Sequence, residues 1–377
     1  MKKASLSFLL SCLTFFFAFS QNAKPVSEYY LFVGTYTAKT SEGIYVYKFN
    51  TKTGNLTYVS TAKGIKNPTF LTITQNQKFI YSVEEMDEGG AVNAFRFDKN
   101  SGILTLLNTQ SSGGAGPCYI SVDQTGKWVV AGNYKGGSLS ILPTKADGSL
   151  DSATQTIQHT GKSINPERQD MPHVHSVNIA PNNKDIFVPD LGTDKIFVYT
   201  LNDRTGLLSP GNPPFVSALP GSGPRHFTIH PNQKFAYVIQ ELNATITAFN
   251  YKNGTLEAFQ TVETLPKDFT GKKWCADIHI SPDGKFLYGS NRGHESLVIF
   301  KIDQKTGSLT YVGHQNVLGK TPRNFIIDPT GEFILVANQD SDNIVVFKRD
   351  KETGLLVATG KEVKVSMPVC LKMMPVK

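Results

Sequence analysis

A turn of the form Gly-x-Leu, preceded by polar residues, occurs seven times along this chain. Its glycines are Gly54, Gly102, Gly148, Gly206, Gly254, Gly307 and Gly354. Successive glycines are 48, 46, 58, 48, 53 and 47 residues apart. A period of this length is typical of repeat proteins, in which one unit cannot bury its apolar faces alone and must stack on its neighbours. If the stack closes into a ring, it encloses a central channel whose mouth is a natural binding site.

A single repeat contains four short apolar runs. In residues 322–360 the runs read PRNFIIDP, EFILVANQ, NIVVFKRD and LLVATGKEV, and turns rich in Gly, Asn and Asp separate them. Four strands joined in this way predict one antiparallel sheet, the blade of a β-propeller. The same pattern fits repeats that begin near Pro68, Pro117, Pro172, Pro224, Trp274 and Pro322.

The seventh blade is predicted to be split between the two ends of the chain. Near the N-terminus only three strands are visible, in residues 29–37, 43–50 and 56–64, and the segment PVCLKMMP at 368–375 supplies the missing one. Pairing of the two ends would close the ring and remove exposed sheet edges. We therefore expect an all-β fold, a seven-bladed β-propeller forming a single domain over residues 29–375.

Residues 1–20 have the pattern of a secretory signal peptide. Two lysines precede an apolar run, and Ala18-Phe19-Ser20 is an acceptable cleavage site before Gln21. The protein is therefore expected to be exported, to the periplasm or the cell exterior. A lipoprotein anchor at Cys12 is the alternative interpretation. No later segment is long and apolar enough to cross a membrane.

The formal net charge is +7, and the basic residues are spread along the chain without a dense tract. Because no aromatic–basic motif accompanies them, nucleic acid is not an expected partner, although anions are attracted. The three cysteines beyond Cys12 lie in separate repeats and do not suggest a disulfide framework. They are expected to be small buried residues.

No cofactor and no metal is expected. The pair His173 and His175 resembles a metal pair, but no third ligand is evident from the sequence. A Gly-x-Ser-x-Gly nucleophile elbow and a phosphate-binding Walker loop are both absent from the sequence.

Strand order predicts where the functional residues gather. The start of each first strand and the end of each second strand lie on the same face of the ring, around the channel mouth. First-strand starts contribute His173, His175, Arg225, His226, Asp277, His279 and Arg323. Second-strand ends contribute Glu84, Glu85, Asn133, Asp190, Glu241, Arg292 and Asn338. Several arginines and histidines beside a few carboxylates indicate a site for an anionic substrate, with acid–base groups at hand.

The longest gap between the glycine turns contains a polar segment that includes Arg168 and leads directly into the two histidines. A long loop that delivers a basic residue beside a binding site is expected to be a wall or lid. A solvated surface insertion is the alternative.

At these motifs the chain resembles the seven-bladed propeller lactonase family. The resemblance is carried by residues 165–181, 221–246, 273–292 and 321–339, and with the blade pattern it covers nearly all of residues 29–375. It implies hydrolysis of a sugar lactone, with His175, Arg225, Glu241 and Arg292 as the catalytic residues. Substrate-binding roles are predicted for Arg168, His173, Asp190, His226 and Arg323.

The chemistry is consistent with that implication. A lactone carbonyl attacked by water develops an oxyanion that a fixed guanidinium stabilises. Either Glu241 or His175 would take the proton of the water, and the other would orient the water or protonate the ring oxygen. The substrate is a small sugar lactone, 6-phosphogluconolactone-like or an unphosphorylated aldonolactone, and an export signal favours the latter. An exported propeller that acts as a non-catalytic binding scaffold is the alternative function. The sequence leaves the oligomeric state open.

Overall fold

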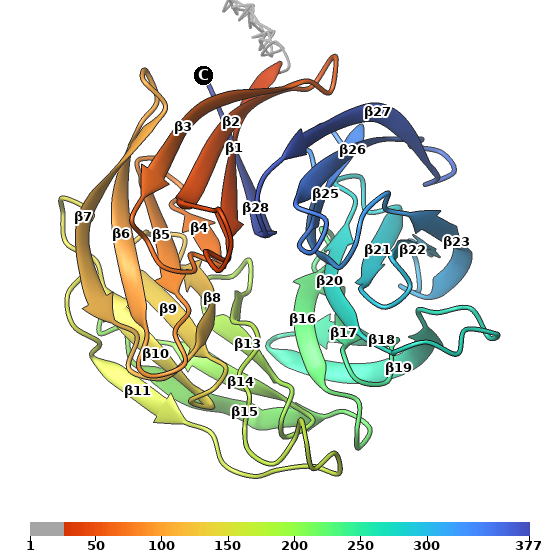
Figure 1. Ribbon diagram of the computed structural model, residues 1–377. Coiled ribbons are helices and arrows are strands. Elements are labelled where there is room, and N and C mark those ends of the chain that lie inside the picture. The colour runs from red at the N-terminus through yellow and green to blue at the C-terminus, as the bar shows by residue number, and fades with distance from the viewer. Residues whose placement is uncertain (1–25) are drawn as a thin grey trace, which may run out of the picture.

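The computed structural model describes residues 26–377, which contain 28 strands and no helix. These strands form seven four-stranded antiparallel sheets. First strands of adjacent sheets contact one another, so they surround the centre of a ring (Figure 1). The predicted all-β seven-bladed propeller is confirmed. No membrane-spanning helix occurs in the described residues, and the expected signal peptide with Cys12 lies outside them.

Six blades are continuous in sequence, and each runs from its inner to its outer strand. The first two are β4 (Leu71–Ile73), β5 (Phe79–Glu84), β6 (Ala91–Asp98), β7 (Ile103–Ser111) and β8 (Pro117–Val122), β9 (Trp128–Asn133), β10 (Ser138–Pro143), β11 (Gln155–Gln158). The next two are β12 (Asn178–Ile179), β13 (Asp185–Asp190), β14 (Lys195–Leu201), β15 (Leu208–Ser217) and β16 (Pro224–Ile229), β17 (Phe235–Gln240), β18 (Thr245–Lys252), β19 (Thr255–Glu263). The last two are β20 (Cys275–Ile280), β21 (Phe286–Asn291), β22 (Ser296–Ile302), β23 (Leu309–Asn316) and β24 (Pro322–Ile327), β25 (Phe333–Asn338), β26 (Asn343–Arg349), β27 (Leu356–Lys364).

The seventh blade joins the two ends of the chain, as expected. Its inner strand is the C-terminal β28 (Pro368–Pro375), which pairs with β1 (Glu28–Thr35); β2 (Gly43–Asn50) and β3 (Leu56–Lys63) complete the sheet. Figure 1 shows the blue β28 beside the red β1.

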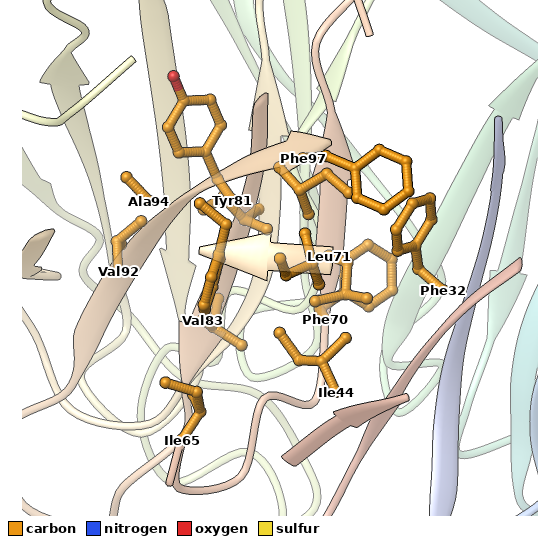
Figure 2. Close-up of a cluster of buried hydrophobic side chains, with 14 of the residues drawn as sticks. Phe32, Ile44, Ile65, Phe70, Leu71, Tyr81, Val83, Val92, Ala94 and Phe97 are labelled. Carbon is orange, nitrogen blue, oxygen red and sulfur yellow. The ribbon is translucent and has the colours of Figure 1, made fainter. Parts of the chain in front are cut away.

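Apolar side chains fill the spaces between blades. Figure 2 shows the cluster between the split blade and the β4–β7 blade, where Phe32 and Ile44 meet Leu71, Val83 and Phe97. The rings of Phe32 and Phe97 pack edge to face with centroids 4.9 Å apart, a favourable arrangement for aromatic pairs.

The seven Gly-x-Leu turns also join the blades. All seven glycines have φ between +72° and +90°, a region that glycine adopts without steric cost. A Cβ at Gly354 would lie 2.4 Å from the Phe286 ring of the preceding blade. In the same place the Tyr288 hydroxyl donates to the Gly354 carbonyl at 2.8 Å, and Tyr237 makes the equivalent bond to Gly307. The motif therefore encodes both a turn and a contact between blades.

Two first strands are shorter than predicted. Regular pairing begins only at Leu71 in β4 and at Asn178 in β12. Ahead of β12 the chain makes a single bridge, between Val174 and Asp190. Because residues 175–177 do not pair regularly with β13, the side chain of His175 can reach the channel mouth.

Candidate active site

Two sets of positions converge at the channel mouth. The first set is the second residue of each first strand, or the equivalent residue ahead of a short first strand. It consists of Thr69, Cys118, His175, Arg225, Ala276, Arg323 and Val369. The second set is the residue that follows each second strand, and β1 is the second strand of the split blade. This set consists of Tyr36, Glu85, Tyr134, Leu191, Glu241, Arg292 and Gln339. Side chains alternate along a strand, so these positions share one direction in every blade.

Glu241 is the centre of the site and is almost fully buried. Its Oε1 accepts hydrogen bonds from Arg168 Nη2 at 2.6 Å and from Trp274 Nε1 at 3.2 Å. Its Oε2 lies 2.8 Å from both Arg225 Nε and Arg292 Nη2. A carboxylate offers about four acceptor positions, and three hydrogen bonds together with the ion pair to Arg292 occupy those of Glu241.

The charge of Glu241 follows from these neighbours. Burial alone raises the pKa of Glu241, but Arg292, Arg225, His175 and Arg168 outweigh it and hold the pKa well below its ordinary value. The group is therefore a permanent carboxylate at neutral pH, and its oxygens are occupied by three hydrogen bonds and an ion pair rather than free to accept a proton. Its evident role is to fix the three arginines.

Arg292 is clamped from three sides. Beyond Glu241, its Nη2 donates to the Cys275 carbonyl at 2.8 Å. Its guanidinium stacks on the Trp274 ring at 3.9 Å, and Lys272 Nζ lies 4.1 Å from the centre of the same ring. Burial lowers the pKa of Arg292 to about 9, so the side chain is a cation at neutral pH.

The loop ahead of the two histidines supplies a wall, as one of the two interpretations predicted. From this loop Arg168 reaches Glu241, and its Nη2 also donates to the Tyr134 hydroxyl at 3.1 Å. The ring of Tyr134 also stacks on the ring of His173, and the two ring centroids lie 4.5 Å apart.

His175 is buried beside Glu241. Its Nε2 lies 3.9 Å from Glu241 Oε2, which is too long for a hydrogen bond, and its Nδ1 lies 3.8 Å from Cys118 Sγ. Burial, reinforced by the positive charge of Arg225, lowers the pKa of His175 well below 6.5. The imidazole is therefore neutral at physiological pH and able to accept a proton.

The Cys118–His175–Glu241 sequence of contacts resembles a cysteine nucleophile with its base, but the thiol is inert. Burial raises the pKa of Cys118, and the Sγ lies 3.6 Å from the carbonyl oxygens of Val174 and His175. A buried thiol without thiolate character is neither a nucleophile nor readily alkylated.

Replacing Cys118 with alanine is therefore expected to leave kcat/KM for any reaction at this site within about threefold of wild type. Iodoacetamide should likewise fail to inactivate the native protein. Steady-state assays before and after alkylation check both statements. Loss of activity that follows alkylation of Cys118, identified by mass spectrometry, would contradict them.

A hydrogen-bonded chain supports Arg225 from below. Arg225 Nη1 donates to the Ala276 carbonyl at 2.5 Å and to His226 Nε2 at 3.1 Å. The other ring nitrogen of His226 donates to Asp277 at 2.7 Å. Burial lowers the pKa of His226 to about 4, so the neutral ring accepts from Arg225 and donates to Asp277.

Arg323 belongs to a separate cluster on the other side of the channel. Its Nη2 donates to the Tyr36 hydroxyl at 3.0 Å, and that hydroxyl donates to Glu85 Oε1 at 2.9 Å. The other oxygen of Glu85 accepts from Thr69 Oγ1 at 2.5 Å. Both oxygens of Glu85 thus bind neutral hydroxyl groups, unlike those of Glu241.

These groups enclose a main cavity of about 210 Å³ that is open at the channel mouth. Its lining consists of Glu85, Cys118, Tyr134, Lys135, Arg168, His175, Glu241, Trp274, Arg292 and Arg323. Four cations face two carboxylates, so the lining carries net positive charge and favours an anion. Beneath it lies a cavity of about 10 Å³, which we call the chamber. The chamber is lined by Thr69, Phe70, Glu85, Cys118, His175, Arg225, His226, Arg323 and Val369.

The structure brings together most of the residues predicted from the sequence. His175, Glu241, Arg292, Arg168 and Arg323 line the main cavity. Arg225 and His226 lie one layer deeper, at the chamber, and their substrate contacts stay predictions. His173 packs behind Tyr134 and lines neither cavity.

Asp190 lies apart from both cavities. It is fully buried, and its oxygens bind His159 Nδ1 at 2.7 Å and the backbone N–H groups of His173, Gly192 and Thr193. As the last residue of β13 it points into its blade rather than toward the channel. These contacts indicate a structural role, and we do not include Asp190 among the proposed substrate contacts.

Sequence reasoning did not select the aromatic residues of the site. Tyr36 and Tyr134 follow second strands and Trp274 precedes a first strand, so the rule used for the charged residues would have found all three. Lys135 lies two residues beyond the end of β9 and was therefore not selected either. The described part of the chain holds no group of three or more His, Cys, Asp or Glu side chains suited to a metal.

A propeller whose channel mouth holds arginines around a buried carboxylate defines a class of protein, one with a pocket for an anionic ligand. The family model "Lactonase, 7-bladed beta-propeller" matches residues 30–373. The 6-phosphogluconolactonase of Bacillus subtilis is 39% identical over 93% of this chain and 99% of its own, and that of Formosa agariphila is 41% identical over 79% and 86%. The solved periplasmic gluconolactonase of Pseudomonas aeruginosa is 37% identical with a TM-score of 0.89, covering 93% of this chain and all of its own. The chain belongs to the lactonase family of seven-bladed β-propellers.

Proposed function

We propose that this protein hydrolyses a sugar lactone in the main cavity. The observation that carries the proposal is the neutral, buried His175 beside a cavity whose arginines are fixed by Glu241. Such a site offers a proton acceptor together with preorganised cations for a developing oxyanion. The lactonases of similar sequence support the same reaction.

The proposed reaction uses water as the nucleophile. The water oxygen forms a bond to the lactone carbonyl carbon while one water proton passes to His175 Nε2. Arg292 stabilises the oxyanion that forms. The ring C–O bond then breaks, and the ring oxygen leaves as a hydroxyl by taking the proton from His175. The product is an open-chain hydroxy acid, which ionises in solution.

The substrate is proposed to carry an anionic or strongly polar group besides the lactone. Lys135, Arg168 and Arg323 border the cavity around Arg292, and guanidinium groups bind phosphate and carboxylate in a bidentate manner. Export by residues 1–20 is also part of the proposal, and the relative from Pseudomonas aeruginosa is described as periplasmic. An unphosphorylated aldonolactone is then the substrate most accessible to the protein.

Hydrolysis of glucono-δ-lactone and of 6-phosphogluconolactone, measured in a pH-stat with the blank rate subtracted, tests the function. We expect turnover of at least one lactone by the wild type, its loss in His175→Asn, and its retention in Arg204→Ala, a change at an exposed position. The preferred lactone shows whether the cations select a phosphate. No turnover of either lactone by a folded protein would favour the binding-scaffold function instead.

The pH dependence of kcat/KM should reflect the neutral imidazole of His175. Because its pKa is held well below 6.5, the active form is fully present from pH 8 down to 6.5, and activity is lost only as the pH falls through the lowered pKa. The blank-corrected profile is therefore expected to be flat between pH 6.5 and 8, with its acid limb well below pH 6.5. A half-maximal rate at pH 6.5 or above would contradict this assignment.

A further inference from the structure

The chamber beneath His175 has the dimensions of a site for one water molecule. Its volume of about 10 Å³ is close to the minimum that one water requires, and a buried water needs two to four polar partners. The chamber offers Glu85, His175, Arg225 and Arg323. Four residues, Glu85, Cys118, His175 and Arg323, line both this chamber and the main cavity. A water held there would thus adjoin the position of the lactone.

Glu85 is the carboxylate of the site that retains acceptor capacity. Each of its two oxygens accepts one hydrogen bond, from Tyr36 at 2.9 Å and from Thr69 at 2.5 Å. About two of its four acceptor positions therefore remain for a ligand. Glu241, by contrast, accepts three hydrogen bonds and also forms an ion pair with Arg292 at 2.8 Å, so little of its acceptor capacity remains.

The surroundings of Glu85 fix its side chain in place. Its backbone N–H donates to the Asn67 carbonyl at 3.1 Å, and its carbonyl accepts from Asn67 Nδ2 at 3.0 Å. The Tyr36 hydroxyl that donates to Glu85 is itself held by Arg323 at 3.0 Å. A carboxylate anchored through both its backbone and its oxygens is preorganised to bind a small ligand.

We propose that the chamber holds the water that attacks the lactone and that Glu85 binds this water, as a further catalytic residue of the reaction proposed above. Glu85 accepts a hydrogen bond from one O–H of the water. The proton of the other O–H passes to His175, and the freed electron pair on oxygen forms the bond to the carbonyl carbon. The inference rests on the proposed lactonase function, to which it adds the position of the nucleophile.

Substitution of Glu85 with glutamine tests the proposal. Glutamine keeps an acceptor for Tyr36 or Thr69 but loses the charge, so kcat is expected to fall about 100-fold or more, with KM within about threefold of wild type. Glu84→Gln is the matched control, because Glu84 ends β5 and lines neither cavity. A loss of less than about threefold in kcat for Glu85→Gln would overturn the proposal.

Chemical rescue separates a catalytic from a structural role. In Glu85→Ala the missing carboxylate leaves space that formate can occupy, so added formate is expected to restore kcat by about tenfold or more while leaving wild type and Glu84→Gln unchanged. A stable, folded Glu85→Ala whose activity does not respond to formate would count against the assignment.

A crystal structure of the unliganded wild type gives a readout that does not depend on activity. An ordered water within hydrogen-bond distance of a Glu85 oxygen in the chamber is expected, and a dry chamber would overturn the proposal whatever the protein hydrolyses. If the wild type hydrolyses lactones and Glu85→Gln does too, only this inference fails. If the wild type hydrolyses none, the proposed function fails, and Glu85 loses its catalytic assignment with it.

Discussion

Glu241→Ala is expected to lower the free energy of unfolding by about 3–5 kcal/mol, because it leaves buried cations without their partner. Arg225 and Arg292 are 2% and 3% exposed, so water cannot replace the carboxylate. Arg168 and Trp274 also lose their acceptor. The arginines would repel one another across the vacated space, and kcat/KM should fall with the stability.

Urea denaturation followed by tryptophan fluorescence measures the change in stability. Glu257→Ala, at an exposed position on β19, is the control and is expected to change the stability by less than about 0.5 kcal/mol. If Glu241→Ala proves as stable as this control, then Glu241 does not hold the arginines by charge.

Arg292→Lys is expected to reduce kcat/KM by about 10²–10³-fold although the charge is kept. Lysine has a compact ammonium and cannot reproduce the planar guanidinium, which contacts Glu241 and the Cys275 carbonyl and stacks on Trp274. The loss should appear mainly in kcat, since the oxyanion forms only in the transition state.

Steady-state kinetics of Arg292→Lys beside Arg204→Lys isolate this effect. Arg204 is exposed on the β14–β15 turn, and its substitution should leave both kcat and KM unchanged. Full activity in Arg292→Lys would mean that any cation suffices at this position, and the oxyanion would then need another donor.

The architecture was predictable because one motif performs two tasks in every blade. Gly354 must adopt a positive φ and must also leave room for Phe286, so the glycine recurs wherever a turn meets the neighbouring blade. The pairing of β28 with β1 was predictable for a related reason: seven glycine turns require seven blades, and the N-terminal repeat has only three strands.

The site was less predictable because its side chains depend on a register of one residue. Glu84 and Glu85, and likewise Asp190 and Glu241, looked equivalent in the sequence as residues near the ends of second strands. Glu84 and Asp190 are the last residues of their strands, whereas Glu85 and Glu241 come one residue later and face the cavity. Strand ends cannot be placed to one residue from sequence alone, and a shift of one turns a side chain to the other face.

The contacts of Trp274 are a second feature of the site that could not be predicted from the sequence. Its position beside a first strand could be read, but its stacking on Arg292 and its bond to Glu241 depend on the meeting of segments from adjacent blades. Such contacts between distant segments are set by packing, and no local pattern records them.

The pairing of β28 with β1 also determines when the ring can close during synthesis. Residues 368–375 are synthesised after every other strand of the ring, so the six continuous blades emerge while the inner position beside β1 is still vacant. Until then β1 has no partner on its inner side and forms an exposed sheet edge, and exposed edges invite pairing with other chains. The closing strand is therefore the last strand of the ring to be added, and the finished site at the channel mouth cannot exist before residues 368–375 have been synthesised.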